Sequence, residues 1–197
     1  MRVAILSSEV VPFAKTGGLA DVAGALPKAL REHDAEAIVA LPHYDQIDRG
    51  FLSERIIENV PVEWRGGTRS TRAWQSDAAG APAYLIEAPE YFSRPSIYGY
   101  GDDHERFAFF SRAALALFKH LDWPPDIIHA NDWPCGFAAI ELRARRSADT
   151  FFQLTRTLFS IHNIAYQGAF DPRDLWWLGF GDPPEREDSC SRAPRRR

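Results

Sequence analysis

A lysine and two adjacent glycines near the amino terminus have the chemistry of an anion-binding loop. Lys15, Gly17 and Gly18 lie between a short apolar run and an amphipathic helical pattern. Adjacent glycines allow the backbone to approach a ligand closely, and the unpaired N–H groups and dipole at a helix start favour phosphate oxygens. Lys15 would add a full positive charge. These residues predict a phosphate-binding loop, with a glycine turn beside a solvated lysine as the alternative.

Two further groups of polar residues follow short apolar runs later in the chain. Asn131 and Asp132 are expected in a loop between one such run and a helix that Pro134 opens. His162 and Asn163 follow another run. In open α/β sheets, ligands bind beyond the carboxyl ends of the strands, so these loops and the glycine loop together predict one site. Each residue also has a structural interpretation, because Asp132 can cap a helix, His162 can bond a backbone carbonyl and Asn163 can form an Asx turn.

The elements that position these loops alternate between extended and helical patterns, which is typical of a parallel sheet with helices on both faces. Apolar runs without polar alternation indicate strands buried on both sides. The sequence therefore predicts an α/β fold with a doubly wound sheet. Strands are expected at 3–6, 37–41, 60–64, 68–75, 83–87, 127–130 and 157–161, and helices at 19–30, 102–120 and 134–146.

Three local features carry more specific expectations. Pro27 lies within the first helical pattern and lacks a backbone donor, so we expect a kink or a break into two helical pieces there. Residues 89–101 mix aromatic residues with prolines and glycines, which predicts a surface loop rather than a regular element. Asp102, with Glu105 three residues later, resembles a capping arrangement for the following helix.

The composition limits the class of protein. The chain has 197 residues, of which 45% are hydrophobic and 25% charged, and this suits one globular domain. A net charge of -4 disfavours nucleic-acid binding. The sequence contains neither a secretory h-region at its start nor an apolar stretch of membrane length, so we expect a cytoplasmic protein without a membrane partner. The two cysteines, Cys135 and Cys190, are far apart and outside metal-ligand spacing, so we expect free thiols and no metal site.

Four segments match the signatures of one enzyme family in order along the chain. They are 15–22 (Lys-Thr-Gly-Gly-Leu-Ala-Asp-Val), 98–107, 125–133 (Pro-Asp-Ile-Ile-His-Ala-Asn-Asp-Trp) and 160–168 (Ser-Ile-His-Asn-Ile-Ala-Tyr-Gln-Gly). In these segments the chain resembles the bacterial glycogen synthases and plant starch synthases, which transfer glucose from ADP-glucose to a growing α-1,4-glucan. The resemblance implies the N-terminal half of a two-domain GT-B glycosyltransferase, with a Rossmann-like doubly wound sheet and reaction in the cleft between the two domains.

The resemblance also implies a role for each candidate residue. One group would bind the diphosphate and glucose of ADP-glucose, one residue would be catalytic beside the donor sugar, and a third group would support the site or the acceptor channel. Transfer in such enzymes retains the anomeric configuration and uses no metal or other cofactor, and the partners are ADP-glucose and an α-1,4-glucan (glycogen) primer. The residues that would bind ADP-glucose are Lys15, Gly17 and Gly18, and the catalytic residue would be His162. The supporting or acceptor-side residues would be Asp21, Asn131, Asp132 and Asn163.

The sequence departs from the family pattern in two places. Pro134 and Cys135 stand where polar or small residues are more usual after Asp-Trp. Residues 181–197 do not resemble the family, so we expect an acceptor-side domain at 1–180 and a disordered tail at 181–197, without the C-terminal donor-binding domain. Such a chain is expected to be inactive alone. The alternatives are a non-enzymatic glucan-binding module and a GT-B enzyme that uses another nucleotide sugar.

Overall fold

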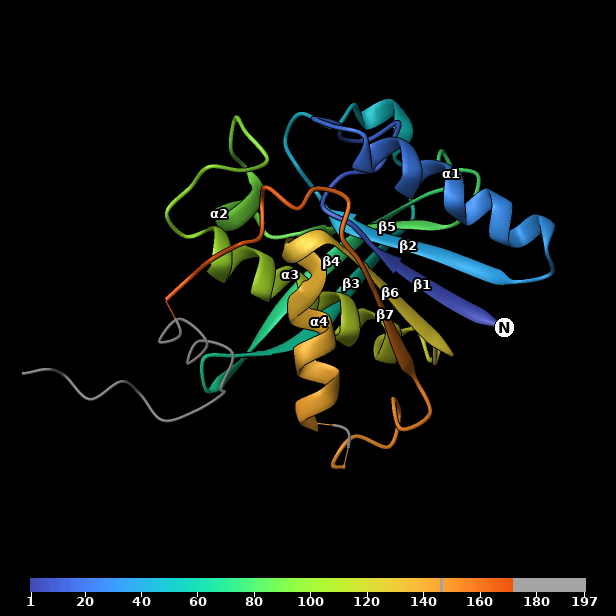
Figure 1. The fold of residues 1–197 in the computed structure, drawn as a ribbon, viewed down its shortest axis with the longest axis vertical. Helices are drawn as coiled ribbons and strands as arrows, with labels where there is room; N and C mark the ends of the chain where they lie inside the picture. Colours follow the sequence, from blue (N-terminus) through green and yellow to red (C-terminus); the bar gives the residue numbers. More distant parts are fainter. Residues whose placement is uncertain (146, 172–197) are drawn as a thin grey trace, which may run out of the picture.

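A seven-stranded sheet forms the centre of the molecule in the computed structural model, which describes residues 1–145 and 147–171 (Figure 1). The strands lie in the order β3-β4-β5-β2-β1-β6-β7. The five strands from β5 to β7 are parallel, while β3 and β4 form an antiparallel hairpin at one end of the sheet. The strand bounds are Arg2–Leu6 (β1), Glu36–Pro42 (β2), Ile56–Trp64 (β3), Gly67–Ser76 (β4), Ala83–Glu87 (β5), Ile127–Asn131 (β6) and Arg156–Ser160 (β7).

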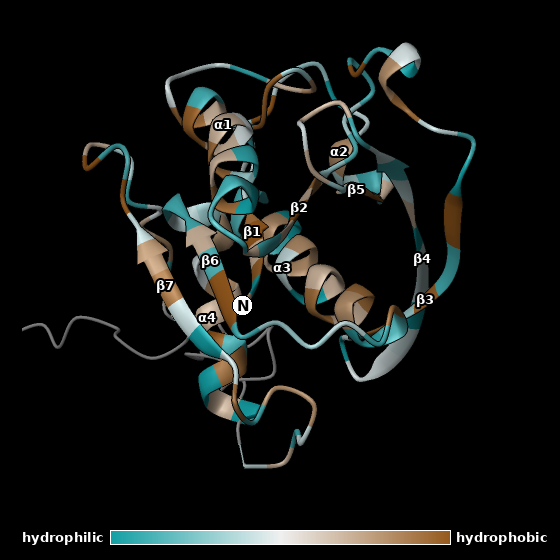
Figure 2. Ribbon diagram, turned by 90° about the vertical axis from the view of Figure 1, so that its right-hand side faces the viewer, coloured by the Kyte–Doolittle hydropathy of each residue, from teal (hydrophilic) through white to brown (hydrophobic). Residues whose placement is uncertain are grey.

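Helices cover both faces of this sheet. Figure 2 shows α1 on one side of β1 and β6, with α3 and α4 on the other side. This follows from right-handed crossovers, because the chain moves from β1 to β2 in one direction and later returns past β1 to β6. The predicted doubly wound α/β fold is thus confirmed. The helix bounds are Leu19–Glu32 (α1), Pro89–Phe92 (α2), Asp103–His120 (α3) and Asp132–Arg145 (α4), with a 3-10 turn at Arg49–Phe51.

The core lies between these layers. The last four residues of β1 and the last six of β2 are buried, as expected for strands covered on both faces. Helix α3 is buried around most of its circumference because it packs on the sheet and on α4. The seven predicted strands are all present, with boundaries shifted by a few residues at most.

A kink or a break into two helical pieces was predicted at Pro27, and the break is wrong. Helix α1 is one continuous element with Pro27 inside it. Pro27 is buried together with Leu19, Ala20 and Ala23, so the helix packs its proline-bearing side against the rest of the protein. Burial of this apolar side outweighs the loss of one backbone hydrogen bond at the proline.

Two expectations near residue 100 also need correction. Residues 93–101 are irregular as predicted, but residues 89–92 form the short helix α2. Tyr91 and Phe92 are buried because aromatic rings from other elements pack against them. Asp102 occupies the N-cap position of α3 but makes no capping hydrogen bond. Its carboxylate instead accepts two hydrogen bonds from Arg94, at 2.6 and 2.7 Å. Two hydrogen bonds from a charged guanidinium are stronger than one from a neutral backbone N–H, so the carboxylate pairs with Arg94.

Some expectations fall outside the described part of the chain. The predicted tail at 181–197 and Cys190 lie there. Cys135 is a free, buried thiol. Within the described residues, no helix combines the length and the apolar character needed to cross a bilayer.

Candidate active site

The three predicted loops leave the same edge of the sheet. Strand β1 pairs in parallel with β2 on one side and with β6 on the other, so the direction of winding reverses at β1. Strand β6 in turn pairs in parallel with β7. The loops after β1, β6 and β7 therefore begin side by side at the carboxyl ends of neighbouring strands (Figure 1).

The first loop presents Lys15 at the surface, held by an acidic partner. Nζ of Lys15 donates to both carboxylate oxygens of Asp21, at 2.7 Å each, and the two side chains are 51% and 57% exposed. Gly17 and Gly18 are exposed as well, with open space where a side chain would lie. The structure thus brings together Lys15 and Asp21, beside a glycine backbone that a ligand can reach.

The same loop contains a buried anion, Glu9, which was not among the predicted site residues. Its Oε2 accepts hydrogen bonds from the backbone N–H groups of Thr16 and Gly17, the latter at 2.9 Å. Two backbone amides of the predicted phosphate-binding loop, both ahead of the first residue of helix α1, therefore bind a carboxylate of the protein itself. A glutamate three residues after a predicted buried strand and eight residues before the first glycine of the turn is the signal that could have found it.

The second and third loops form one hydrogen-bonded cluster. Nε2 of His162 lies 2.9 Å from Oδ1 of Asn131. Oδ1 of Asp132 accepts from the backbone N–H of His162 at 2.7 Å and from that of Asn163 at 3.4 Å. The four predicted residues of these loops are thus in direct contact.

Asn131 determines that the Nε2 atom of His162 carries a proton. Its Nδ2 donates to the carbonyls of Leu6 at 3.0 Å and of His129 at 3.3 Å, so its Oδ1 must face His162. Because that oxygen can only accept, Nε2 of His162 carries the proton. The ring then presents Nδ1 to other partners, and His162 is exposed. Asn131 itself is buried and connects the cluster to the end of β1.

The predicted loop between β6 and the next helix is absent. Asn131 is the last residue of β6, and helix α4 begins at Asp132, with Pro134 in its first turn. The strand enters the helix through a positive φ of 55° at Asp132, a conformation that Asp tolerates better than most residues. Asp132 therefore combines a tight connection with a carboxylate that holds the loop after β7.

Trp133 and the end of the described chain form an aromatic support behind this cluster. The Trp133 ring packs against Phe107 at 5.2 Å and Phe170 at 5.0 Å between centroids. Gly168, with φ of 61°, lies so close to the indole that a Cβ would come within 2.5 Å of it. The segment after β7 thus turns back over the start of α4 (Figure 1), and Trp133 serves packing.

His129 is a second histidine in the cluster and was not predicted. Its Nε2 lies 2.7 Å from Oγ of Ser160 on β7. Burial, together with the neighbouring His162, lowers the pKa of His129.

We expect His129 to make folding stability depend on pH. In the unfolded chain a histidine binds a proton near pH 6.5, whereas folded His129 does so only at lower pH. Its contribution is therefore present above about pH 6.5 and is lost as the pH falls through the folded-state pKa. Urea unfolding between pH 7.5 and 5.5 should show a shallower decline for His129→Gln than for wild type. Equal slopes would contradict this. The pKa of His43 is also lowered by burial, so His43 would account for the dependence of stability on pH that remains in His129→Gln.

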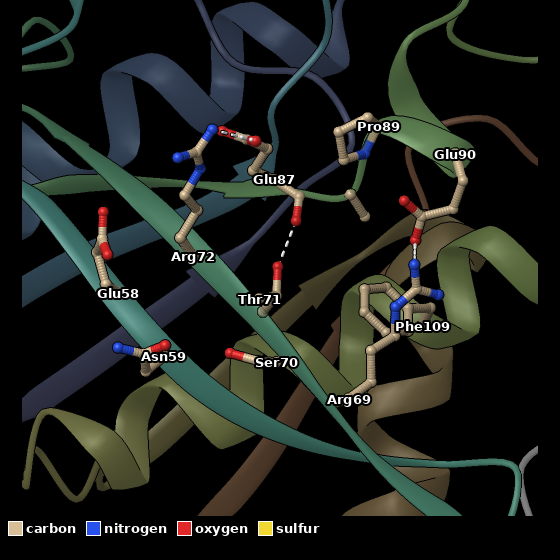
Figure 3. Close-up of a pocket in the computed structure, with 11 residues that line it drawn as sticks. Glu58, Asn59, Arg69, Ser70, Thr71, Arg72, Glu87, Pro89, Glu90 and Phe109 are labelled. Carbon is tan, nitrogen blue, oxygen red and sulfur yellow. Dashed lines mark hydrogen bonds and ion pairs between the residues drawn. The ribbon is translucent and has the colours of Figure 1, made fainter.

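A pocket of about 230 Å³ lies apart from this cluster, on the β3–β4 hairpin and the end of β5 (Figure 3). Two arginines line it, but each is paired with a glutamate, Arg69 with Glu90 and Arg72 with Glu87. This pairing makes the pocket a poor match for a diphosphate. Among the described residues, no group of three His, Cys, Asp or Glu side chains is placed to hold a metal ion.

Known proteins resemble this chain over most of its length. A model of the starch synthase catalytic domain matches residues 2–193. The glycogen synthase of Clostridium beijerinckii is 43% identical over 89% of the chain, and that of Geotalea daltonii is 43% identical over 93%. The chain spans 37% and 39% of the lengths of these two relatives.

Solved structures show the same relationship. The catalytic domain of starch synthase IV from Arabidopsis thaliana, bound to ADP and acarbose, is 32% identical with a TM-score of 0.79, covering 91% of this chain and 37% of that one. A sucrose-phosphate synthase from Thermosynechococcus elongatus, at 16% identity and a TM-score of 0.52, shares the fold alone. The chain belongs to the starch synthase catalytic domain family, and its fold is that of the Rossmann-like N-terminal domain of a GT-B glycosyltransferase.

Proposed function

We propose that this chain forms the acceptor-side half of the active site of an ADP-glucose-dependent glycogen synthase. The reaction is transfer of glucose, with retention, from ADP-glucose to the non-reducing end of an α-1,4-glucan. One observation carries the proposal. In a chain of this family, the Lys15–Asp21 pair and the His162–Asn131–Asp132 cluster follow neighbouring strands at one edge of the sheet. The relative bound to ADP and acarbose supports a nucleotide and a glucan-like ligand for the family.

Lys15 would act on the diphosphate. When the bond to glucose breaks, negative charge increases on the departing diphosphate, and a fixed cation stabilises that charge without rearranging. Lys15 is already held by Asp21, so the diphosphate would share or replace a carboxylate at Nζ. Gly17 and Gly18 leave room for this approach, since nothing lies within 4 Å of where a Cβ would be.

His162 would act beside the donor sugar. Asp132 holds its backbone and Asn131 holds its ring, so the imidazole is preorganised at two points. The proton on Nε2 leaves Nδ1 as the ring atom that faces other partners, and the fixed dipole of the ring can stabilise an oxocarbenium-like sugar. Asn163 shapes the loop by accepting a hydrogen bond from the N–H of Ala165 at 3.1 Å.

The proposal also concerns domain organisation. We expect residues 1–180 to form one domain, with the donor-binding half of the cleft supplied by the part of the relatives that the chain does not match. The chain covers 37% of the Clostridium beijerinckii glycogen synthase. A completed enzyme for testing this proposal joins residues 1–180 of the chain to the remaining, unmatched part of that synthase.

Labelled glucose incorporation into glycogen tests the function. The completed enzyme should transfer glucose from ADP-glucose to glycogen, while the isolated chain should transfer none. Rapid transfer by the isolated chain would contradict the two-domain requirement. A completed enzyme that binds glycogen but transfers no glucose would indicate a glucan-binding module.

A further inference from the structure

Glu9 lies buried at the junction of two loops that are far apart in the sequence. Only 3% of the surface of Glu9 is exposed. Oε1 accepts hydrogen bonds from Oγ1 of Thr16 and from the phenol of Tyr98, both at 2.7 Å. Oε2 accepts from the backbone N–H groups of Thr16 and Gly17. One carboxylate thus gathers four donors, three from the glycine loop and one from the segment before α3.

These four donors explain how an anion is tolerated in a buried place. A buried carboxylate is costly unless hydrogen bonds replace its water. Burial raises the pKa of Glu9, but the bonds from Thr16, Tyr98 and Gly17 outweigh it and hold the pKa below its usual value. Burial also raises the pKa of Tyr98 far above its usual value, so the phenol remains a neutral donor. The carboxylate is therefore ionised at neutral pH.

The direction of these bonds decides what the loop can present to a ligand. The amides of Thr16 and Gly17 point at Glu9, so they are already occupied. Lys15, next in sequence to Thr16, extends to the exposed side, where Asp21 holds it. Tyr98 also bonds Oγ of Ser8 at 2.7 Å, which ties the segment before α3 to the end of β1.

We propose that Glu9 is a positioning residue that sets the conformation of the Lys15-Thr16-Gly17-Gly18 loop, with Tyr98 holding Glu9 in place. In this assignment the amides of Thr16 and Gly17 bind the carboxylate of the protein throughout, and the diphosphate meets Lys15 and the exposed edge of the glycines. Only the kinetic consequence rests on the proposed function.

Amide NMR of the chain itself tests the positioning role without any activity. The amide proton shifts of Thr16 and Gly17 should follow one titration, that of Glu9, as the pH is lowered. In Glu9→Gln this titration should vanish and exchange of both amides with solvent should accelerate at least about tenfold, since hydrogen bonds to a charged acceptor are lost. Amides of β2 should keep their exchange rates. Unchanged shifts and exchange at Thr16 and Gly17 would overturn the proposal.

Kinetics of the completed enzyme separate positioning from simple stability. Glu9→Gln should lower kcat/KM for ADP-glucose at least about tenfold, with KM for glycogen unchanged. Tyr98→Phe should show a smaller change in the same direction. The matched control is Glu141→Gln, which alters a buried carboxylate paired with Arg112 and should lower stability without changing kcat/KM.

The two measurements have distinguishable failures. If the completed enzyme is inactive in every form, the proposed function fails and the amide titration alone decides the role of Glu9. If Glu9→Gln and Glu141→Gln lose only stability to a similar extent, with equal kcat/KM, the positioning role is wrong. Should Glu9→Gln not fold, Tyr98→Phe carries both readouts, because it removes one donor and keeps the ring that packs on Phe107 at 5.8 Å.

Discussion

Replacing Lys15 by alanine in the completed enzyme should lower kcat/KM for ADP-glucose at least about 30-fold, which corresponds to about 2 kcal/mol of transition-state stabilisation. The ammonium interacts more strongly with the departing diphosphate than with the resting substrate, so kcat should fall as well as donor affinity. Steady-state kinetics with ADP-glucose varied at saturating glycogen measure both parameters. Unchanged kcat and KM would remove Lys15 from the site.

Lys15→Ala should change the kinetics with little effect on folding stability. Both side chains of the Lys15–Asp21 pair are about half exposed, and pairs of this kind contribute little to folding. The free energy of unfolding should therefore change by less than about 0.5 kcal/mol. Lys15→Arg should restore activity only in part, because a planar fork differs from a compact ammonium beside two glycines. Lys28→Ala, on an exposed position of α1, is the matched control and should keep wild-type kinetics.

The sequence predicted the sheet well because its strands are apolar runs buried on both faces. Once β1, β6 and β7 are parallel neighbours, their following loops must share one edge, and this brings Asn131, Asp132, His162 and Asn163 together. The apolar patterns of the strands and their parallel order were therefore enough to predict that these four residues lie together. The roles of these residues in transfer stay predictions.

What the sequence could not show are the contacts between distant segments. Glu9 bonds Tyr98 across 89 residues, and no local pattern marks that pair. The aromatic segment 89–101 has the composition of a loop, but Phe92 is buried against Tyr44, which lies in a different part of the chain. Asp102 has the spacing of a cap but bonds Arg94, because a charged partner is within reach. In each case a long-range or charged contact prevails over the local preference.

The same reasoning predicts a large stability effect at Asp103 and Arg106, two residues of the 98–107 family motif. Arg106 is fully buried, and its Nη1 donates to Oδ1 of Asp103 at 2.8 Å and to the carbonyl of Ile97 at 3.0 Å. Its Nε and Nη2 find no hydrogen-bond acceptor among the described residues. The guanidinium lies instead over aromatic rings, with centroid distances of 5.2 Å to Phe92, 5.0 Å to Tyr100 and 5.0 Å to Phe107.

Asp103→Asn should therefore lower the free energy of unfolding by about 3–5 kcal/mol, because it leaves a buried cation without its counter-charge. Asp102→Asn, the neighbouring control, removes a partly exposed partner of Arg94 and should cost less than about 1 kcal/mol. Urea unfolding at pH 7 compares the two. A loss at Asp103 no larger than at Asp102 would show that the pair is dispensable.

A double-mutant cycle identifies the source of this loss. Arg106→Met removes the cation and keeps an apolar side chain among the rings, so adding it to Asp103→Asn should recover part of the stability, giving a coupling of about 0.5–3 kcal/mol. Additive losses would contradict an ion pair as the cause.

Because Arg106 also holds the carbonyl of Ile97, next to Tyr98, loosening the Asp103–Arg106 pair should release the phenol of Tyr98 from Glu9. We then expect faster amide exchange at Thr16 and Gly17 in Asp103→Asn, although neither residue contacts Asp103. This would connect a buried ion pair in α3 to the loop that presents Lys15.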